Sequence, residues 1–488
     1  MSGGPVGTAT AEVVAGPAVA PGRAARLGRG ALAVLVLLCG VALALGFANK
    51  DRCTGTTFDQ WGRSTPDFAE RKYREACYSD IQYLWVGRDV DRHVFPYVDG
   101  GITADGELRG GTVEYPVLTG LVIWLGALAV HTDAGFLLAS ALIMAPFGLV
   151  TAWLLGRLSR WRALVWALSP PLVLYAFHNW ELPVVLCATA AVYVVHRGWG
   201  RRGVDRPLRH RAHAAAVLLG LGFAFKLYPA IFVLPLMLYV LTGGRGGAEL
   251  PAGRRRDVAG MVTTALVAMG TAVAVNAPFA LAGFDGWLAS FTFQGQRKAD
   301  ITSNSIWYWA LRPDSEPQND AVNHLVNIAS PVAVFASFAV AATIGWVRYR
   351  REGTYPWVPV SAAMLCGFLL LHKVHSPQYA LWLVPMFVLV RVRWGWIAAY
   401  FAADLAMGIG IFVWFADIAD DVPAGVYDGF AAQAVMIGVW GRAALLVGLF
   451  TAFLTHRSTV DEEVTPPVPA AAAPPAPAPG AGAPATPR

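Results

Sequence analysis

The sequence predicts an all-α polytopic membrane protein, a bundle of about twelve transmembrane helices with a large first extracytoplasmic loop that carries surface helices. Of its 488 residues, 56% are hydrophobic and only 14% are charged. The mean hydropathy of +0.48 lies far above that of a soluble domain. Apolar stretches of roughly 17 to 25 residues, long enough to cross a hydrocarbon core of about 30 Å, recur along almost the whole chain. No part of the sequence is left over for a soluble catalytic domain.

The chain begins with a basic segment, residues 1–29, which precedes the first apolar stretch at 31–48. Arg23, Arg26 and Arg29 resemble the start of a secretory signal, but no convincing small-residue cleavage site follows. We therefore expect an uncleaved signal anchor with a disordered cytoplasmic N-terminus.

The chain ends with a segment, residues 458–488, that consists mostly of Pro and Ala and cannot bury a hydrophobic core. We expect a disordered cytoplasmic tail there. Residues 30–457, between the two terminal segments, are expected to form one transmembrane domain, in which residues 49–133 make up the first outer loop module.

The net charge of +6 comes largely from arginines in short loops beside apolar stretches, which is the positive-inside pattern of a membrane protein and not a nucleic-acid-binding surface. Because each crossing reverses sides, this pattern predicts the location of every loop. The predicted cytoplasmic loops are residues 157–162, 197–211, 245–256, 348–351, 391–393 and 456–457. The predicted outer segments after the first loop are residues 178–181, 226–229, 284–309, 372–378 and 417–429.

This alternation requires that one of the two apolar segments before the first internal basic loop does not cross the membrane. The segment at 115–130 is short, begins at Pro116 and has no basic residue at its far end. We expect it to lie at the outer surface or to dip into it. The apolar run around Lys226 is interrupted by Pro229, and its two short halves are expected to meet at the base of a cavity.

Two of the five cysteines, Cys53 and Cys77, fall in the first outer loop. Because that side of the membrane is oxidising, we expect a disulfide between them. Cys39, Cys187 and Cys366 lie in apolar segments, where we interpret them as packing residues.

The first outer loop is rich in carboxylates, and Asp80 is the leading candidate for a catalytic group. It belongs to an amphipathic stretch, residues 78–85, which we expect to lie against the outer leaflet with its acid near the mouth of the cavity. A partly desolvated carboxylate there suits general-base chemistry on a hydroxyl group. A solvated loop acid is the alternative, and Asp89, Asp91 and Glu114 are rival candidates in the same loop.

Two basic features are candidates for binding an anionic group. Lys226 lies in an otherwise apolar run, where a cation costs roughly 2.5 to 3.5 kcal/mol on insertion scales and usually faces a cavity or an anion. Snorkelling of Lys226 to the outer interface is the alternative. The turn at 372–379 places Lys373 between His372 and His375, which suits a departing phosphate, although an ordinary polar turn has the same pattern.

Arg297 and Lys298 form a further basic cluster on the outer side, against the positive-inside trend, with Asn304 close behind them. Such a cluster indicates an anionic partner, either a substrate or a lipid headgroup. Arg88 in the first loop offers a guanidinium fork for phosphate oxygens, or it pairs with neighbouring loop acids.

Asn179 and Glu181 lie in a short outer segment between two apolar stretches, where they could contact a substrate or cap a helix. The sequence shows no zinc-ligand spacing, no Walker loop and no Gly-rich dinucleotide fingerprint. A soluble nucleotide-linked substrate is therefore not expected. A divalent ion stays an open question, because the outer acids could coordinate one.

Five short motifs occur in a defined order on the predicted outer side. They are Ser79-Asp80-Ile81, Glu114-Tyr115-Pro116, Lys226-Leu227-Tyr228-Pro229, Ser376-Pro377-Gln378-Tyr379 and Leu381-Trp382-Leu383-Val384-Pro385. Their order and sidedness resemble family 87 of the membrane-embedded GT-C glycosyltransferases, over about residues 30 to 455. Two positions depart from the family pattern: Val117 replaces a common second proline, and His178-Asn179 replaces a common Gly-Gln.

The resemblance implies a GT-C-like bundle that moves a sugar, which we expect to be mannose, from a polyprenyl-phosphate donor to a lipid- or polysaccharide-linked acceptor on the outer face of the plasma membrane. By its position, Asp80 matches the catalytic base of that family. Our hypothesis is an inverting transfer in which polyprenyl phosphate leaves toward His375, Lys373, Lys226 or Arg297. The other expected substrate contacts are Arg88, Glu114, Tyr115, Asn179, Glu181, Tyr228, Lys298, Asn304 and Gln378. No bound cofactor is implied.

Two other classes of protein compete with this prediction. A transporter or flippase for anionic substrates would explain the basic residues, but it would place charge near the midplane and show paired repeats. An envelope polysaccharide polymerase or ligase is also an outer-face enzyme with many spans. Such proteins usually carry their large polar loop late in the chain, whereas here it comes early.

Overall fold

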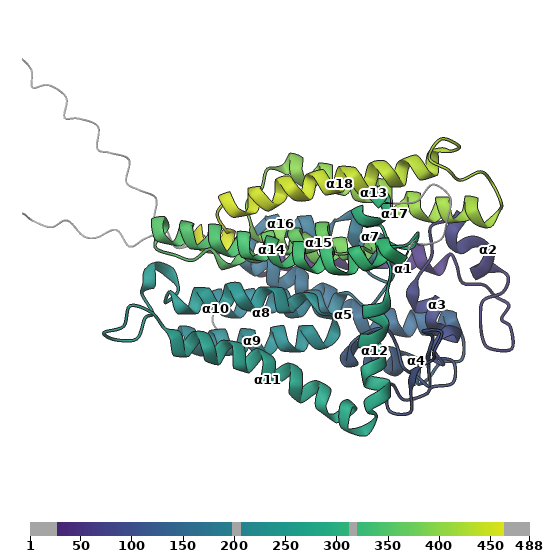
Figure 1. The fold of residues 1–488 in the computed structure, drawn as a ribbon, viewed down its shortest axis with the longest axis horizontal. Coiled ribbons are helices and arrows are strands. Elements are labelled where there is room, and N and C mark those ends of the chain that lie inside the picture. Colours follow the sequence, from purple (N-terminus) through teal and green to yellow (C-terminus); the bar gives the residue numbers. More distant parts are fainter. Residues whose placement is uncertain (1–26, 198–205, 312–319, 463–488) are drawn as a thin grey trace, which may run out of the picture. The chain divides into compact units, whose positions relative to one another are not determined.

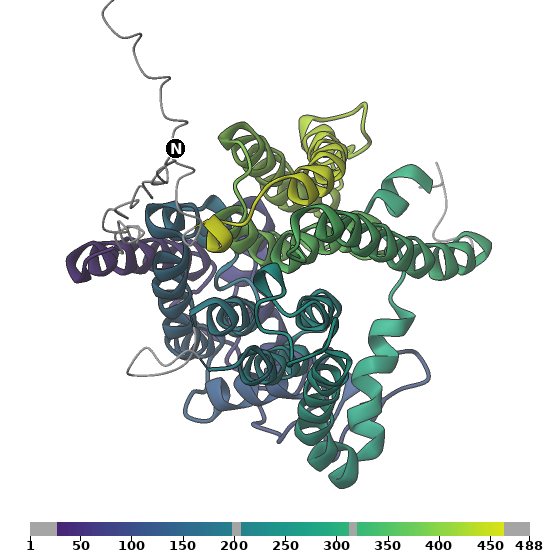
Figure 2. The same ribbon diagram turned by 90° about the vertical axis from the view of Figure 1, so that its left-hand side faces the viewer.

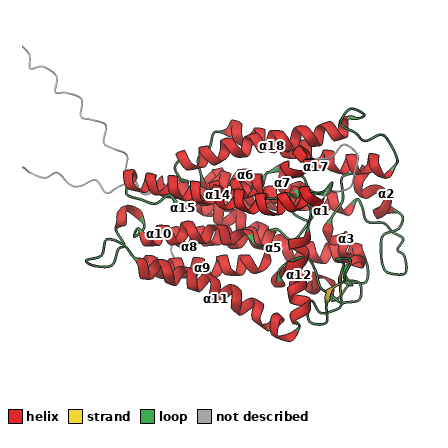
Figure 3. Ribbon diagram, in the orientation of Figure 1, coloured by secondary structure: helices red, strands yellow, loops and turns green. Residues whose placement is uncertain are grey.

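The computed structural model describes residues 27–197, 206–311 and 320–462 (Figure 1). Nearly all of the predicted disordered N-terminal segment, the Pro/Ala-rich tail from residue 463 and residues 198–205 of one predicted cytoplasmic loop lie outside these ranges. The described residues are mostly helical, with one short two-stranded hairpin (Figure 3).

Seven helical segments of the described chain are long and apolar enough to cross a membrane. They are α1 (Arg29–Asp51), α5 with η1 and α6 (Asp133–Ala167), the η2–α10–η3 segment (Tyr228–Gly247), α11 (Val258–Ala282), α14 (Asp320–Glu352), α17 (Trp394–Ala419) and α18 (Phe430–Thr455). Shorter apolar helices are α4 (Val117–Ala127), α8 (Leu182–Arg197), α15 (Trp357–Leu371) and the η4–α16 segment (Pro377–Leu389). The predicted multi-pass helical fold is confirmed, whereas the predicted count of about twelve crossings is not.

Fewer segments meet this length criterion than the hydropathy pattern predicts, because several apolar stretches fold as short or broken helices. α15 has 15 residues and is therefore about 22 Å long, less than a hydrocarbon core of about 30 Å. α4 has 11 residues and extends only about 16 Å, which agrees with the expectation that this segment does not cross. α9 (Leu208–Phe225) begins with a cluster of basic side chains, which lowers its hydropathy.

The long helices run alongside one another, as Figures 1 and 2 show from two directions. α9 packs against both α8 and α11, α5 packs against α1 and α8, and α15 joins α14 to α18. α17 packs along α18. The remaining short helices are α7 (Pro170–Tyr175), α12 (Phe284–Gln296), α13 (Ile306–Leu311) and α19 (Thr459–Glu462).

The apolar run around Lys226 is broken, as predicted. α9 ends at Phe225, and Lys226 has extended backbone angles (φ −153°, ψ 148°). The chain resumes as the 3-10 helix η2 (Tyr228–Phe232), in which Pro229 has no N–H to continue an α-helical ladder. The break places the Lys226 side chain on the wall of a cavity.

The chain between α1 and α4 contains α2 (Asp67–Arg74), α3 (Asp80–Gly87) and the antiparallel strands β1 (Gly101–Ile102) and β2 (Leu108–Arg109), in which Gly101 pairs with Arg109. The predicted disulfide between Cys53 and Cys77 is confirmed. It joins the end of α1 to the residues that precede α3.

The start of α3 is fixed against the segment between α7 and α8. The Ser79 hydroxyl accepts from the Ile81 N–H at 3.2 Å and donates to the Phe177 carbonyl at 2.7 Å. The Asp80 N–H donates to the His178 carbonyl at 2.8 Å. These three bonds satisfy groups at the helix N-terminus and hold Asp80 beside residue 178.

Several loops predicted to be cytoplasmic lie together at the other end of the helices. The Arg162 guanidinium donates to the Phe387 carbonyl at 2.8 Å, and the Arg391 N–H donates to the Arg457 carbonyl at 3.3 Å. In Figure 1, α2, α3 and α4 lie at the opposite end of the long helices. The loops therefore segregate as the charge pattern predicts.

We predict that the unfolded protein exposes three thiols to a maleimide before reduction and five after it, because three of its five cysteines are free. Replacing both Cys53 and Cys77 with Ser should lower the free energy of unfolding by about 3 kcal/mol in the chain-entropy model. Labelling of five thiols without reduction would contradict the disulfide.

Candidate active site

A cavity of about 1400 Å³ opens at the end of the helices that carries α2 and α3. Its walls come from the first loop, from residues 178–179, 226–228, 290–304 and 372–379, and from α17. The predicted site residues that line it are Asp80, Arg88, Glu114, Tyr115, Asn179, Lys226, Tyr228, Arg297, Lys298, Asn304, Lys373 and Gln378. Glu181 and His375 are buried outside the lining.

Asp80 is the first residue of α3, and both of its carboxylate oxygens accept a hydrogen bond. The Tyr78 hydroxyl donates to Oδ1 at 2.9 Å, and the Asn179 side-chain amide donates to Oδ2 at 2.5 Å. Burial raises the pKa of the Tyr78 phenol well above its ordinary value, so this hydroxyl stays protonated and remains a donor. Each carboxylate oxygen has two lone-pair sites and keeps one of them for a substrate hydroxyl.

Asn179 connects Asp80 to Lys226. Its Oδ1 accepts from the Lys226 ammonium at 2.9 Å, while its nitrogen donates to Asp80 and, at 2.7 Å, to the Tyr115 hydroxyl. A side-chain amide offers one acceptor atom and one donor atom, so only one orientation satisfies both charged neighbours. The amide nitrogen is therefore held toward the carboxylate.

Glu181 is the charged partner of Lys226. Its Oε1 lies 3.1 Å from the Lys226 nitrogen, and its Oε2 accepts from the Trp382 indole N–H at 2.6 Å. Breaking a buried pair of this kind costs about 3 to 5 kcal/mol, because the remaining charge loses its partner. Lys226 also lies 4.1 Å from the centroid of the Tyr115 ring. Lys226 is therefore bound on several sides and supports Asn179.

The rival acids of the first loop have other positions. Asp89 and Asp91 do not line the cavity. Glu114 does, but its carboxylate lies 3.0 Å from the Arg88 guanidinium. Of these four acids, Asp80 alone lines the cavity without a salt bridge to a described residue. Within the described ranges, no group of three or more His, Cys, Asp or Glu side chains is arranged to hold a metal ion.

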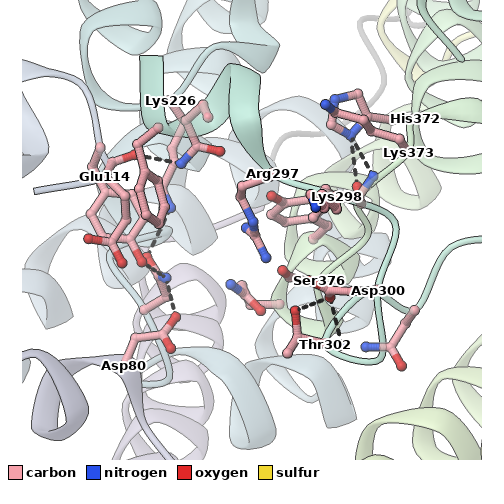
Figure 4. A pocket seen from close by; sticks show the side chains of 18 of the residues that line it. Asp80, Glu114, Lys226, Arg297, Lys298, Asp300, Thr302, His372, Lys373 and Ser376 are labelled. Atoms are coloured by element: carbon pink, nitrogen blue, oxygen red, sulfur yellow. Dashed lines mark hydrogen bonds between the residues drawn. The ribbon is translucent and has the colours of Figure 1, made fainter. Parts of the chain in front are cut away.

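The cationic part of the cavity is formed by Arg297, Lys298 and Lys373. Arg297 and Lys298 follow α12, and the Lys373 ammonium donates to the Gly295 carbonyl at 2.9 Å and to Asn327 Oδ1 at 2.7 Å. Figure 4 shows Asp80 and Lys373 on opposite sides of the view, with Arg297 between them. The cavity therefore has a carboxylate end and a cationic end.

The two histidines of the turn are not cations at neutral pH. Burial lowers the pKa of His372 below its ordinary value and that of His375 well below it. The sequence offered three possible cations in this turn, and the structure leaves Lys373. His375 is fully buried and does not line the cavity, so it is not in a position to contact a phosphate there.

Two charged groups inside the transmembrane helices escaped the sequence analysis. Arg442 of α18 is 3% exposed, and its Nη2 donates to the Asn304 carbonyl at 2.9 Å. Asp404 of α17 is fully buried and interacts electrostatically with Arg442. The signal was available in the sequence, because an ionisable residue within an apolar helix is costly and needs a partner.

Arg442 anchors the segments that carry the cations. The Asn304 N–H donates to the His375 carbonyl at 3.0 Å, and the Ser303 hydroxyl donates to the Lys373 carbonyl at 2.9 Å. These bonds join the residues after Lys298 to the turn at Lys373. The guanidinium then fixes the joined segments to α18.

Residues 205–454, slightly more than half of the chain, match the family described as mannosyltransferase (PIG-M). GPI mannosyltransferase 1 of Saccharomyces cerevisiae is 22% identical over 370 residues, which cover 72% of this chain and 85% of the yeast protein. GPI mannosyltransferase 1 of Trypanosoma brucei brucei is 25% identical over 323 residues, 63% of this chain and 67% of that protein.

Among solved structures, the chain is similar to ArnT from Cupriavidus metallidurans bound to undecaprenyl phosphate, with a TM-score of 0.41 and 15% identity over 86% of this chain and 77% of that one. It is also similar to the oligosaccharyltransferase AglB from Archaeoglobus fulgidus in complex with an inhibitory peptide and a dolichol-phosphate, with a TM-score of 0.40 and 11% identity over 88% of this chain and 56% of that one. Both similarities are weak, so the assignment rests on the sequence family.

The apolar helices and the sequence relatives together define a multi-pass membrane glycosyltransferase. The chain belongs to the mannosyltransferase (PIG-M) family. This confirms the prediction of a membrane mannosyltransferase and favours it over a transporter or a polymerase, while membership of family 87 stays a prediction. The matched range includes Lys226 and Arg297 but begins after Asp80.

We predict that Asn179→Ala lowers the rate of mannosyl transfer by about 10- to 100-fold, because Asp80 loses the donor that orients Oδ2. Asn179→Asp should lower it further, since it places a second carboxylate beside the first. Initial rates in membranes containing equal amounts of each variant measure this effect. A wild-type rate for Asn179→Ala would show that Asp80 does not need this contact.

We predict that Arg442→Met lowers the free energy of unfolding, because buried Asp404 loses the nearby guanidinium and the Asn304 carbonyl loses its donor. Adding Asp404→Leu should restore most of the stability without restoring transfer, since the Asn304 contact is still missing. Thermal unfolding in detergent, together with transfer rates, measures both effects. Equal stability of the single and double variants would contradict a stabilising electrostatic interaction between Asp404 and Arg442.

Proposed function

We propose that this protein transfers mannose from a polyprenyl-phosphate donor to a glycolipid or polysaccharide-linked acceptor at the outer face of the plasma membrane, through an inverting GT-C-type mechanism. One observation carries the proposal. Asp80 is held by two hydrogen-bond donors on the wall of a cavity whose other end carries Arg297, Lys298 and Lys373. This arrangement offers a base and a site for a departing phosphate in one space.

The chemical step uses both ends of the cavity. The Asp80 carboxylate takes the proton of an acceptor hydroxyl while that oxygen forms a bond to the anomeric carbon of mannose. The bond from the anomeric carbon to the phosphate oxygen breaks with its electron pair, so polyprenyl phosphate leaves as an anion. Because attack and departure occur on opposite sides of the anomeric carbon, the configuration inverts.

The three cations suit the leaving group. Negative charge grows on the phosphate oxygen as the bond breaks, and fixed cations near that position lower the barrier. Arg297 adds a planar fork that can bind two phosphate oxygens at once. Holding donor and acceptor in one cavity supplies a further part of the rate enhancement.

Three features support a lipid donor used at the outer face. The cavity lies at the end of a bundle of apolar helices, where a prenyl chain can stay in the bilayer. The Cys53–Cys77 disulfide in the segment beside Asp80 favours an oxidising compartment. The basic loops gather at the other end of the helices, the end that the positive-inside rule assigns to the cytoplasm.

The relatives support the sugar and the acceptor class. Two of them are GPI mannosyltransferases, and this chain covers 85% and 67% of their lengths. A mannosyltransferase that acts on a glycolipid fits a cavity lined by both hydroxylated and apolar side chains. We therefore place a lipid-linked acceptor ahead of a polysaccharide one.

We predict that Asp80→Asn lowers transfer of radiolabelled mannose from polyprenyl-phosphate mannose by about 100- to 10,000-fold, because the amide is isosteric but not basic. Asp91→Asn is the matched control, since Asp91 belongs to the same loop but does not line the cavity. Wild-type transfer by Asp80→Asn would remove Asp80 from the mechanism, and loss of transfer in both variants would indicate a general defect of the loop.

We predict that Arg297→Ala raises the KM for the polyprenyl-phosphate donor about tenfold or more, because a charge-assisted contact to phosphate is worth roughly 1.5 to 3 kcal/mol. Arg92→Ala, at an exposed position outside the cavity, should leave it unchanged. The measurement is the initial rate as a function of donor concentration. An unchanged donor KM in Arg297→Ala would argue against phosphate binding at this end.

A further inference from the structure

Four aromatic side chains form a continuous surface on the cavity wall, here called the aromatic wall: Tyr73, Tyr78, Phe412 and Phe415. Tyr73 belongs to α2, Tyr78 precedes α3, and the two phenylalanines belong to α17. Tyr78 lies in the centre, with its ring centroid 5.9 Å from that of Tyr73 and 5.6 Å from that of Phe412. Phe415 lies 5.5 Å from Tyr73.

The aromatic wall also packs α2 against α17. This packing does not need the hydroxyl groups of Tyr73 and Tyr78. Tyr73, Tyr78 and Phe415 remain partly exposed at the cavity. Tyr83, whose ring lies 5.9 Å from Tyr78, is 46% exposed and lines the cavity as well. Among the described residues, the hydroxyls of Tyr73 and Tyr83 have no hydrogen-bond partner, so both can bind a ligand.

The position of the aromatic wall is defined by Asp80. The Tyr78 hydroxyl, which belongs to the wall, donates to the Asp80 carboxylate at 2.9 Å. In an inverting transfer, the attacking hydroxyl and the leaving phosphate lie on opposite sides of the anomeric carbon. The base marks the acceptor side, and the cations Arg297, Lys298 and Lys373 mark the donor side. The aromatic wall therefore faces the part of the acceptor that carries the reacting hydroxyl.

The chemistry of the wall favours a ring that is apolar on its faces and polar at its edge. An aromatic face carries partial negative charge and attracts the weakly positive C–H groups of a saturated ring. Tyrosine adds a hydroxyl for hydrogen bonding with the edge of such a ring. None of the four side chains is charged. The Lys72 ammonium lies 5.0 Å from the centroid of the Tyr73 ring but does not line the cavity.

We propose that the aromatic wall is the acceptor subsite and that it stacks a polyhydroxylated six-membered ring, a pyranose or a cyclitol, at the head of a lipid. This rests on the proposed function and names the part of the acceptor that the cavity recognises. The donor's prenyl chain is the competing occupant, and it would lie on the same wall only if the donor entered from the Asp80 side.

The test changes the wall and leaves Asp80 and the cations in place. The purified full chain is assayed with radiolabelled polyprenyl-phosphate mannose and synthetic lipids headed either by a pyranose or by a cyclitol. Tyr73→Leu and Phe415→Leu should each raise the acceptor KM about three- to tenfold, with the donor KM unchanged within about twofold. If the leucine variants raise the KM for only one of the two lipids, the head group of that lipid is the ring that the aromatic wall binds.

Matched variants separate stacking from folding. Tyr73→Phe and Phe415→Tyr keep an aromatic face and should keep the acceptor KM within about threefold of the wild type. Phe401→Leu, on α17 but outside the cavity lining, should keep wild-type values for both substrates. Tyr78→Phe keeps the ring but loses the bond to Asp80, so kcat should fall while the acceptor KM stays unchanged.

Three outcomes would overturn the proposal. An unchanged acceptor KM in both leucine variants would show that the wall does not bind the acceptor. A raised donor KM with an unchanged acceptor KM would assign the wall to the donor chain. Failure of the wild type to transfer mannose from the lipid donor would overturn the function on which the subsite rests, whereas normal transfer with unchanged KM values overturns the subsite alone.

Discussion

The hydrogen bonds of Asn179 are the interaction on which the site depends. A lysine bound directly to Asp80 would lower the basicity of the carboxylate, because an adjacent cation stabilises its charged form. Here the neutral amide stands between them, accepting from Lys226 and donating to Asp80. Glu181 compensates the charge of Lys226 at 3.1 Å. Asp80 therefore keeps a fixed orientation without a directly bound cation, which suits the general-base role that we propose for it.

The helix breaks of the fold bring these groups together. Asn179 lies just before α8, Lys226 lies at the extended residue after α9, and Trp382, which binds Glu181, belongs to the η4–α16 segment. If the helix continued at any of these places, the polar side chain there would not reach its present partner at the cavity. The same irregularities shorten several helices, so fewer helical segments of the described chain are long enough to cross a membrane than the hydropathy pattern predicts. Irregular backbone in membrane proteins is tolerated where it lines a polar space, and the break at Lys226 lines the cavity.

The sequence was most informative about candidate site residues whose charge is unusual for their position. Lys226 was identified because a lone cation in an apolar run must face something polar, and Arg297 was identified because it violates the positive-inside trend. The salt-bridge partners of charged residues depend on tertiary structure and could not be predicted from sequence spacing. Glu181 pairs with Lys226, and Arg88 pairs with Glu114. The burial of His375 was hidden for the same reason. Arg442 and Asp404 were visible as charges within apolar helices, but a hydropathy average conceals single residues. The predicted count of about twelve crossings is not confirmed, because apolar composition does not reveal where a helix breaks.

A structure of the full chain with bound polyprenyl-phosphate mannose tests most directly which end of the cavity binds the phosphate and which end faces the acceptor. Electron cryo-microscopy in lipid nanodiscs would locate the phosphate and the mannose ring. We expect the phosphate to lie within hydrogen-bonding distance of Arg297 and Lys373. We expect Asp80 to lie on the other side of the anomeric carbon, opposite the phosphate. A phosphate bound beside Asn179 and Lys226, with Arg297 and Lys373 away from it, would contradict this assignment.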